Sequence, residues 1–139
     1  MPENRTLAFE AGGLEAITFA LRTHVYDARV ASQACLAIFI ICLHEENRDT
    51  AAAAAAVSAI AAALRAHVGD AVGGACAGED ACYALRYLCF SDHGEPIAEN
   101  VRRARIGGAG RGAARLAAAR ARKEDTVWLE ELSVTLNSH

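Results

Sequence analysis

Cysteine is the residue of this chain whose possible chemistry is most easily tested by its spacing. Four of the five cysteines form two pairs seven residues apart, Cys35 with Cys42 and Cys82 with Cys89. On a helix, seven residues span about 10.5 Å, which is too far for a disulfide or for two ligands of one zinc ion. We therefore expect four buried free thiols that pack as small apolar groups. The fifth, Cys76, lies in a glycine-rich stretch and is the candidate for an exposed, reactive thiol.

Two short segments contain residue types that catalyse reactions or bind phosphate in other proteins. The run from Ser91 to Glu95 holds a serine, an aspartate and a histidine, but catalytic triads converge from separate segments, so we expect a polar loop here. The run Gly108–Ala113 matches a loose dinucleotide-binding string. That mechanism needs a preceding strand, and Arg102–Ile106 does not have a strand pattern.

None of the histidines is spaced as a set of metal ligands. The chain has five, His24, His44, His67, His93 and His139. His24 and His67 occupy equivalent positions near predicted helix ends, where a donor close to the last carbonyls is favourable. We expect both to cap helix C-termini. Taken together, these candidates indicate that the chain is not an enzyme and that it needs no cofactor and no metal.

Positive charge is concentrated in one segment of the chain. Residues 102–123 carry a charge of +8 with no acid, whereas residues 1–101 carry −7 and the last sixteen carry −4, which sum to the net charge of −3. Such a segment can bind RNA, anionic lipid or an acidic protein, or pair with acidic surfaces of earlier parts of the chain. The absence of aromatic residues within it disfavours nucleic acid. Its basic residues are Arg102, Arg103, Arg105, Arg111, Arg115, Arg120, Arg122 and Lys123.

Length and composition are those of about one globular domain. The chain has 139 residues, of which 53% are apolar and 22% charged, and only two prolines, so long stretches are free to be helical. The longest apolar run, Ala34–Leu43, is half a bilayer span, so we expect no transmembrane segment. An odd number of cysteines and a polar N-terminus favour an intracellular location, cytoplasmic or nuclear.

An internal repeat determines how these residues are positioned. A shift of 43 residues aligns Asn4–Val25 with Asn47–Val68 at eleven identities, and a shift of 47 aligns Ala34–Ile38 with Ala81–Leu85. A third, degraded copy starts at Asn100. We therefore divide the chain into repeat 1 (about 4–46), repeat 2 (about 47–99) and a degenerate repeat 3 (about 100–139).

Each repeat predicts three helices. In the first copy a short helix runs from Asn4, as N-cap, to Ala11, and the Gly12-Gly13 turn follows it. A second helix carries Leu14, Ile17 and Leu21 on one face, and a third runs from about Ala28 to Leu43. None of these helices can bury its apolar face alone, so neighbouring repeats must stack to form the core.

This pattern resembles the armadillo repeat. The residues that carry the resemblance are the Asn-Arg pair, Ala11–Ile17, Ala20–Arg22 and Ala34–Ile38, over roughly residues 4–90 and more loosely over 100–136. The resemblance implies an all-α, right-handed solenoid whose third helices line a concave groove. Such proteins are usually scaffolds that bind an extended peptide or a helix of a protein partner.

The expected groove differs from that of the nuclear-import adaptors that share the repeat. Those adaptors carry a tryptophan and an asparagine on each third helix, whereas this chain has Leu36 and Tyr83, and Ile40 and Tyr87, at the equivalent positions. Binding of a basic localisation signal by that mechanism is therefore not expected. Because tyrosine and arginine dominate interface hot spots, we place the protein-binding groove at Leu36, Phe39, Ile40, Tyr83, Arg86 and Tyr87.

Two departures from the repeat pattern lead to further expectations. Ala55-Ala56 replaces the glycine turn in the second copy, so its first two helices are expected to fuse. The third copy contains Gly110 and Gly112 inside its second helix, so it is either frayed or a capping unit. Uncapped ends of a short array also make self-association possible. The alternative to a protein-binding scaffold is an electrostatic binder of nucleic acid or an anionic surface through residues 102–123.

Overall fold

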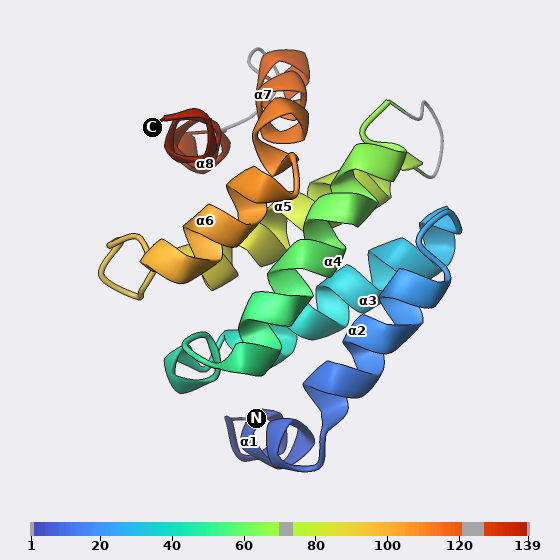
Figure 1. The fold of residues 1–139 in the computed structure, drawn as a ribbon, viewed down its shortest axis with the longest axis vertical. Helices are drawn as coiled ribbons and strands as arrows, with labels where there is room; N and C mark the ends of the chain where they lie inside the picture. The colour runs from blue at the N-terminus through green and yellow to red at the C-terminus, as the bar shows by residue number, and fades with distance from the viewer. Residues whose placement is uncertain (1, 70–73, 121–126, 139) are drawn as a thin grey trace.

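The computed structural model describes residues 2–69, 74–120 and 127–138, and within these ranges the chain is all-α, as predicted (Figure 1). No strand occurs in the described ranges, where one isolated bridge joins Phe90 to Pro96. A 3-10 turn spans Glu45–Asn47. The α-helices of these ranges are α1 (Pro2–Glu10), α2 (Gly13–Thr23), α3 (Ala28–Cys42), α4 (Ala51–His67), α5 (Gly74–Cys89), α6 (Ala98–Ile106), α7 (Ala109–Arg120) and α8 (Val127–Asn137).

The first three helices follow the bounds expected from the sequence, with one correction. Gly12 has φ of 81° between α1 and α2, a left-handed conformation that favours glycine. Asp27 caps α3, since its side chain accepts hydrogen bonds from the Arg29 and Val30 amides. Asn4 was expected to be an N-cap, and this is wrong because α1 already begins at Pro2.

The alanine run of the second copy forms one continuous helix, α4, as the loss of its glycine turn predicted. Thr50 caps α4 by accepting a hydrogen bond from the Ala53 amide. The cap expected at Asn47 is wrong, because Asn47 lies in the 3-10 turn with its amide buried.

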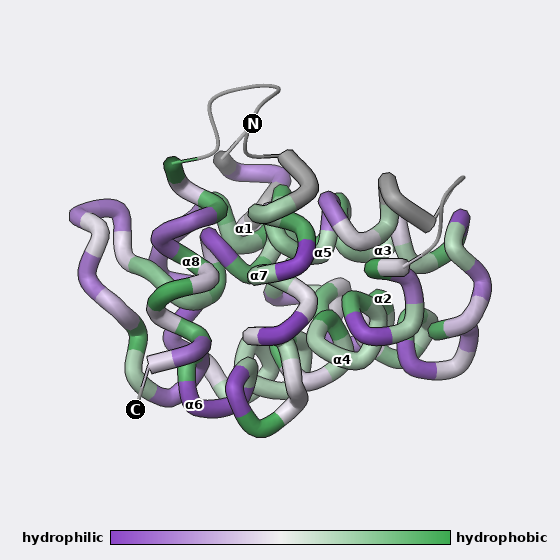
Figure 2. Tube along the Cα trace, turned by 90° about the horizontal axis from the view of Figure 1, so that it is seen from above, coloured by the Kyte–Doolittle hydropathy of each residue, from purple (hydrophilic) through white to green (hydrophobic). Residues whose placement is uncertain are grey.

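The helices form two layers. Helices α3 and α5 pack side by side, and α4 lies across them in front (Figure 1). Seen from above, α4 and α6 lie on the opposite side of the molecule from α3 and α5 (Figure 2). The core is rich in alanine, with leucine and isoleucine among its largest members, and it includes the fully buried thiols of Cys35, Cys42, Cys82 and Cys89. Burial raises the pKa of each of these thiols to about 12, which makes them inert apolar groups.

The glycines of the third copy permit close packing. A Cβ on Gly112 would lie 2.7 Å from Leu64 Cγ, and one on Gly110 would lie 2.6 Å from the Asn137 side-chain oxygen and 2.9 Å from the Leu136 carbonyl oxygen. These glycines therefore let α7 approach α4 and α8 closely. Of the two alternatives given for the third copy, fraying is not seen in α7, which is helical from Ala109 to Arg120.

Among the described residues, no helix combines the length and the apolar character that crossing a bilayer requires.

Candidate functional site

All six residues predicted for the groove lie on α3 and α5, and three of them form ring contacts between these two helices. Phe39 of α3 touches both tyrosines of α5, with ring centroids 6.4 Å from Tyr83 and 4.9 Å from Tyr87. Ile40 is half exposed on the next position of α3, and Arg86 is exposed on α5. Leu36, one turn earlier on α3, is partly buried.

A third helix contributes a tryptophan that the sequence reasoning missed. Trp128 of α8 stacks on Tyr83 with ring centroids 4.6 Å apart and an interplanar angle of 23°. The Arg86 guanidinium lies over both neighbours, 5.4 Å from the Trp128 centroid and 5.6 Å from that of Tyr87. The third copy aligns too loosely with the first two to place Trp128 on the groove. The only signal in the sequence was that Trp128 is the single tryptophan of the chain. We call Phe39, Tyr83, Arg86, Tyr87 and Trp128 the ring surface.

A hollow of about 460 Å³ adjoins the ring surface. Three residues of the ring surface line it, Arg86, Tyr87 and Trp128. The lining is mixed in charge, because it also includes Arg48 and the carboxylates of Asp92 and Glu131. Such a lining offers rings for contact area and polar groups of both signs for orientation, the combination found at protein interfaces.

Arg48 lines this hollow and contacts other residues that line it. Its side chain is 1% exposed and makes an ion pair of 2.8 Å with Asp92. The guanidinium also donates to the carbonyl oxygens of Cys42, Leu43 and Phe90, which lie at the ends of α3 and α5. Arg48 therefore satisfies helix-end carbonyls and fixes the loop after α5.

The loop from Ser91 to Glu95 is the polar connection expected from its sequence. The Ser91 hydroxyl accepts hydrogen bonds of 3.2 Å from the backbone amides of His93 and Glu95. Asp92 is engaged by Arg48, and its amide donates to Glu45. These contacts shape the loop and lead it into α6.

The histidine predicted to cap its own helix has a different partner. His67 at the end of α4 donates from Nε2 to the Val25 carbonyl oxygen at 2.6 Å, so it binds the turn after α2. This hydrogen bond links the end of α4 to the turn after α2 and is not itself a cap on α4. The side chain of His24 is exposed, and its backbone amide closes the end of α2 on Ala20.

Two of the predicted basic residues share one carboxylate within their own helix. Arg102 and Arg103 make ion pairs of 2.8 and 2.9 Å with Glu99 on α6. Hydrogen bonds from both guanidinium groups lower the pKa of Glu99 to about 2, and the same contact raises the pKa of Arg102. The pairing with acids of earlier repeats expected from the sequence is replaced here by pairing within α6.

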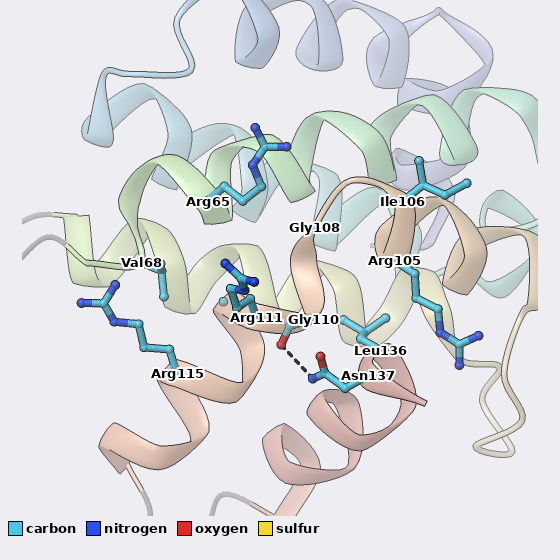
Figure 3. Close-up of a pocket in the computed structure, with 11 residues that line it drawn as sticks. Arg65, Val68, Arg105, Ile106, Gly108, Gly110, Arg111, Arg115, Leu136 and Asn137 are labelled. Carbon is cyan, nitrogen blue, oxygen red and sulfur yellow. Dashed lines mark hydrogen bonds between the residues drawn. The ribbon is translucent and has the colours of Figure 1, made fainter. Parts of the chain in front are cut away.

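The other described basic residues line a separate cavity. Arg105 of α6 and Arg111 and Arg115 of α7 join Arg65 of α4 around a space of about 720 Å³, shown in Figure 3. We call this the arginine pocket. The Nη1 group of Arg65 donates to the Gly107 carbonyl oxygen at 3.0 Å, and Nε of Arg105 donates to the Thr135 carbonyl oxygen at 3.1 Å.

Several predicted residues lie outside the part of the chain whose side chains are described. These are Cys76 and three members of the predicted basic patch, Arg120, Arg122 and Lys123. Within the described part, no group of three or more histidines, cysteines or carboxylates is placed to hold a metal ion.

On the α3–α5 interface the Ser32 hydroxyl donates to Asp80, and burial raises the pKa of that carboxyl.

The N-terminal end of the molecule presents apolar side chains. Leu7 of α1 is 62% exposed, Phe19 of α2 is 71% exposed, and Tyr26 in the following turn is 86% exposed. The sequence allowed self-association through the uncapped ends of the expected array, and the N-terminal end is one of them.

Comparison of the chain with family models, with curated proteins and with solved structures finds no match. The resemblance to the armadillo repeat therefore depends on the residues of the chain alone.

Proposed function

We propose that the chain is an armadillo-like array of two full units and a degenerate third, and that its ring surface binds a segment of a partner protein. The observation that carries the proposal is the contact of Tyr83 with both Phe39 and Trp128, because it joins the last helix of each proposed unit, α3, α5 and α8, in one row. Aromatic residues and arginine provide most of the binding energy at protein interfaces.

Equivalent asparagines in successive units support the repeat. The Asn47 side chain donates to the Ile41 carbonyl oxygen at 2.9 Å, and the Asn100 side chain donates to that of Leu88. Ile41 and Leu88 are themselves 47 residues apart, the shift that aligns the third helices of the first two units. Each asparagine thus holds the end of the preceding third helix, which is the stacking that an array requires.

The chemistry of the ring surface favours a polypeptide with apolar or aromatic side chains, in an extended or helical conformation. Phe39, Tyr83, Tyr87 and Trp128 offer large flat surfaces, while Arg86, Asp92 and Glu131 can pair with polar groups at the rim. The adaptor asparagines that hold an extended peptide backbone are replaced by Ile40 and Tyr87. Recognition by side-chain packing is therefore proposed in place of backbone hydrogen bonding. Free buried thiols fit a reducing, intracellular location.

The proposal is tested by affinity capture from a cell lysate with matched variants. The double variant Arg86→Ala, Tyr87→Ala should lose the captured partner and keep its helical circular dichroism. The control Arg111→Ala, Arg115→Ala removes two arginines outside the ring surface and should retain the partner. Loss of helical signal in the first variant would mean that its residues belong to the core.

The electrostatic alternative gives the opposite pattern. If residues 102–123 bind nucleic acid or an anionic surface, capture should fall steeply as salt is raised from about 50 to about 200 mM. It should also be lost in the control variant and kept in the ring-surface variant. The observation that favours this alternative is the gathering of Arg105, Arg111 and Arg115 in one cavity.

A further inference from the structure

The arginine pocket is lined by three arginines of one basic segment and by a fourth from a distant part of the sequence. Arg65 comes from α4, Arg105 from α6, and Arg111 and Arg115 from α7, while Leu136 and Asn137 of α8 close one side (Figure 3). The Asn137 amide donates to the Gly110 carbonyl oxygen at 2.9 Å, which fixes α8 against the start of α7. The cavity is therefore built by four helices and is not a property of one charged face.

These charges are not compensated by the groups that hold them. The lining of the pocket includes no aspartate or glutamate among the described residues. Arg65 and Arg105 are held by carbonyl oxygens, which are neutral acceptors. Arg111 and Arg115 make no ion pair with any carboxylate of the described chain. By contrast, Arg48, Arg102 and Arg103 each have a carboxylate partner.

Two of the four guanidinium groups are already positioned. Arg65 and Arg105 use part of their five N–H donors on carbonyl oxygens and keep the others for a ligand. Gly108, with φ of 83°, gives the Arg65 side chain room, since a Cβ there would lie 2.9 Å from Arg65 Cδ. Arginines fixed in this way lose less conformational entropy when they bind an anion.

We propose that the arginine pocket binds a small organic polyphosphate, a molecule with at least two phosphate groups. A phosphate monoester carries a charge of about −1.5 to −2, so neutralising four arginines takes two or more phosphates. Guanidinium is also the side chain whose fork matches phosphate oxygens. This proposal is independent of the ring surface, because the two share no residue.

The shape of the site selects a small molecule over a nucleic acid strand. The volume of about 720 Å³ lies within the range of about 300–1,000 Å³ typical of small-ligand pockets. No aromatic residue lines it among the described residues, so it offers no ring on which bases could stack. Two sources share the required chemistry, a free inositol polyphosphate and the head group of a phosphoinositide lipid.

The test is titration calorimetry of the full chain with inositol hexakisphosphate. The variant Arg111→Gln, Arg115→Gln should bind about tenfold or more weakly, as expected from the loss of charge-assisted hydrogen bonds. The control Arg102→Gln, Arg103→Gln makes the same change in net charge outside the pocket and should bind within about threefold of wild type. Absence of binding to the wild type, or equal weakening in both variants, would overturn the proposal.

Two further arms complete the experiment. Vesicles of phosphatidylcholine with and without phosphatidylinositol bisphosphate distinguish the sources: retention on the phosphoinositide vesicles alone supports a lipid head group, and binding of hexakisphosphate without retention supports a free ligand. Tighter binding of single-stranded RNA than of hexakisphosphate, weakened in both variants, would contradict a small-molecule site.

A measurement on the wild type keeps the proposal testable if a variant fails to fold. In nuclear magnetic resonance spectra of the labelled chain, hexakisphosphate should shift the backbone amides of Gly108, Gly110 and Gly112 most. Largest shifts at the ring surface, or evenly over the molecule, would contradict the assignment to this pocket.

Discussion

The ring surface and the arginine pocket both contain arginines, but the neighbours of those arginines differ. On the ring surface Arg86 lies over two aromatic rings, and Arg48 below it is buried with a carboxylate and three carbonyl oxygens. In the arginine pocket four arginines line a cavity with no carboxylate in its described lining. The difference teaches that the role of an arginine is determined by what surrounds it: contact area in one region, uncompensated charge in the other.

The two regions are also built by different small residues. The ring surface lies on α3, α5 and α8, where α3 and α5 pack through alanines and cysteines and large rings can stand beside one another. The pocket exists because Gly110 and Gly112 bring α7 close to its neighbours and because the α6–α7 turn contains Gly108 with a positive φ.

The largest expected effect compares a buried arginine with a pocket arginine. Arg48→Met should lower the free energy of unfolding by about 3 kcal/mol, because it leaves three carbonyls and Asp92 without their donor. Arg111→Met, at an exposed position, should stay within about 0.5 kcal/mol of wild type. Urea unfolding followed by circular dichroism measures both. Equal losses would mean that the pocket arginines are structural.

The next effect tests whether the glycines of α7 are needed for packing. Gly110→Ala should destabilise the chain by about 1–3 kcal/mol, because the new methyl group would overlap the Leu136 carbonyl and the Asn137 side chain. Helix propensity alone predicts a gain of about 1 kcal/mol. The control Ala114→Gly, exposed on the same helix, should cost about 1 kcal/mol. A more stable Gly110→Ala variant would show that the close approach of α7 and α8 does not limit stability.

The positions of the helices were predictable where the sequence contains local signals for turns and helices. The Gly12-Gly13 turn, the alanine run of α4 and the repeated third helix gave the helices of the first two units. Asn47 was misread as a helix cap because an asparagine before a helix favours capping, whereas its buried side chain donates to the Ile41 carbonyl oxygen near the end of α3. Such a bond depends on tertiary packing, which a local pattern does not contain.

The candidate site was predictable in part for a related reason. Phe39, Tyr83 and Tyr87 could be placed together because two copies of the third helix align. Trp128 could not, since the third copy lacks that alignment. Arg65 was missed as a partner of Arg105, Arg111 and Arg115, because it lies on another helix and is brought near by the close packing at Gly107 and Gly112.

A smaller effect is expected for Arg86 of the ring surface, and the fluorescence of Trp128, the single tryptophan, reports it. Arg86→Gln removes a cation from the faces of Tyr87 and Trp128, which should cost about 0.5–1 kcal/mol and change the fluorescence emission of Trp128. Arg115→Gln should leave the emission unchanged. If both variants change the emission of Trp128 equally, the emission depends on the net charge of the molecule and not on the contact with Arg86.

The smallest effect concerns arginines that do have a carboxylate partner. The pKa of Glu99 is lowered from 4.5 to about 2 in the folded chain, so its ion pairs stabilise the fold above about pH 4.5 and are lost as the pH falls toward 2. Thermal midpoints of wild type and Glu99→Gln should therefore differ slightly at neutral pH and converge near pH 2. Arg111→Gln should show no such convergence over this window, because no described carboxylate pairs with Arg111. Parallel curves for Glu99→Gln would contradict the pairing.

The most direct test of the proposed protein-binding surface is the affinity of a peptide selected on the wild-type chain from a random library displayed on phage, measured for wild type, Arg86→Ala with Tyr87→Ala, and Arg111→Ala with Arg115→Ala. The account predicts that the ring-surface variant binds about tenfold or more weakly, and that the pocket variant binds as the wild type does. It also predicts little change in affinity between about 50 and about 200 mM salt. A peptide that needs the pocket arginines, loses affinity steeply with salt and ignores the ring-surface substitutions would contradict it.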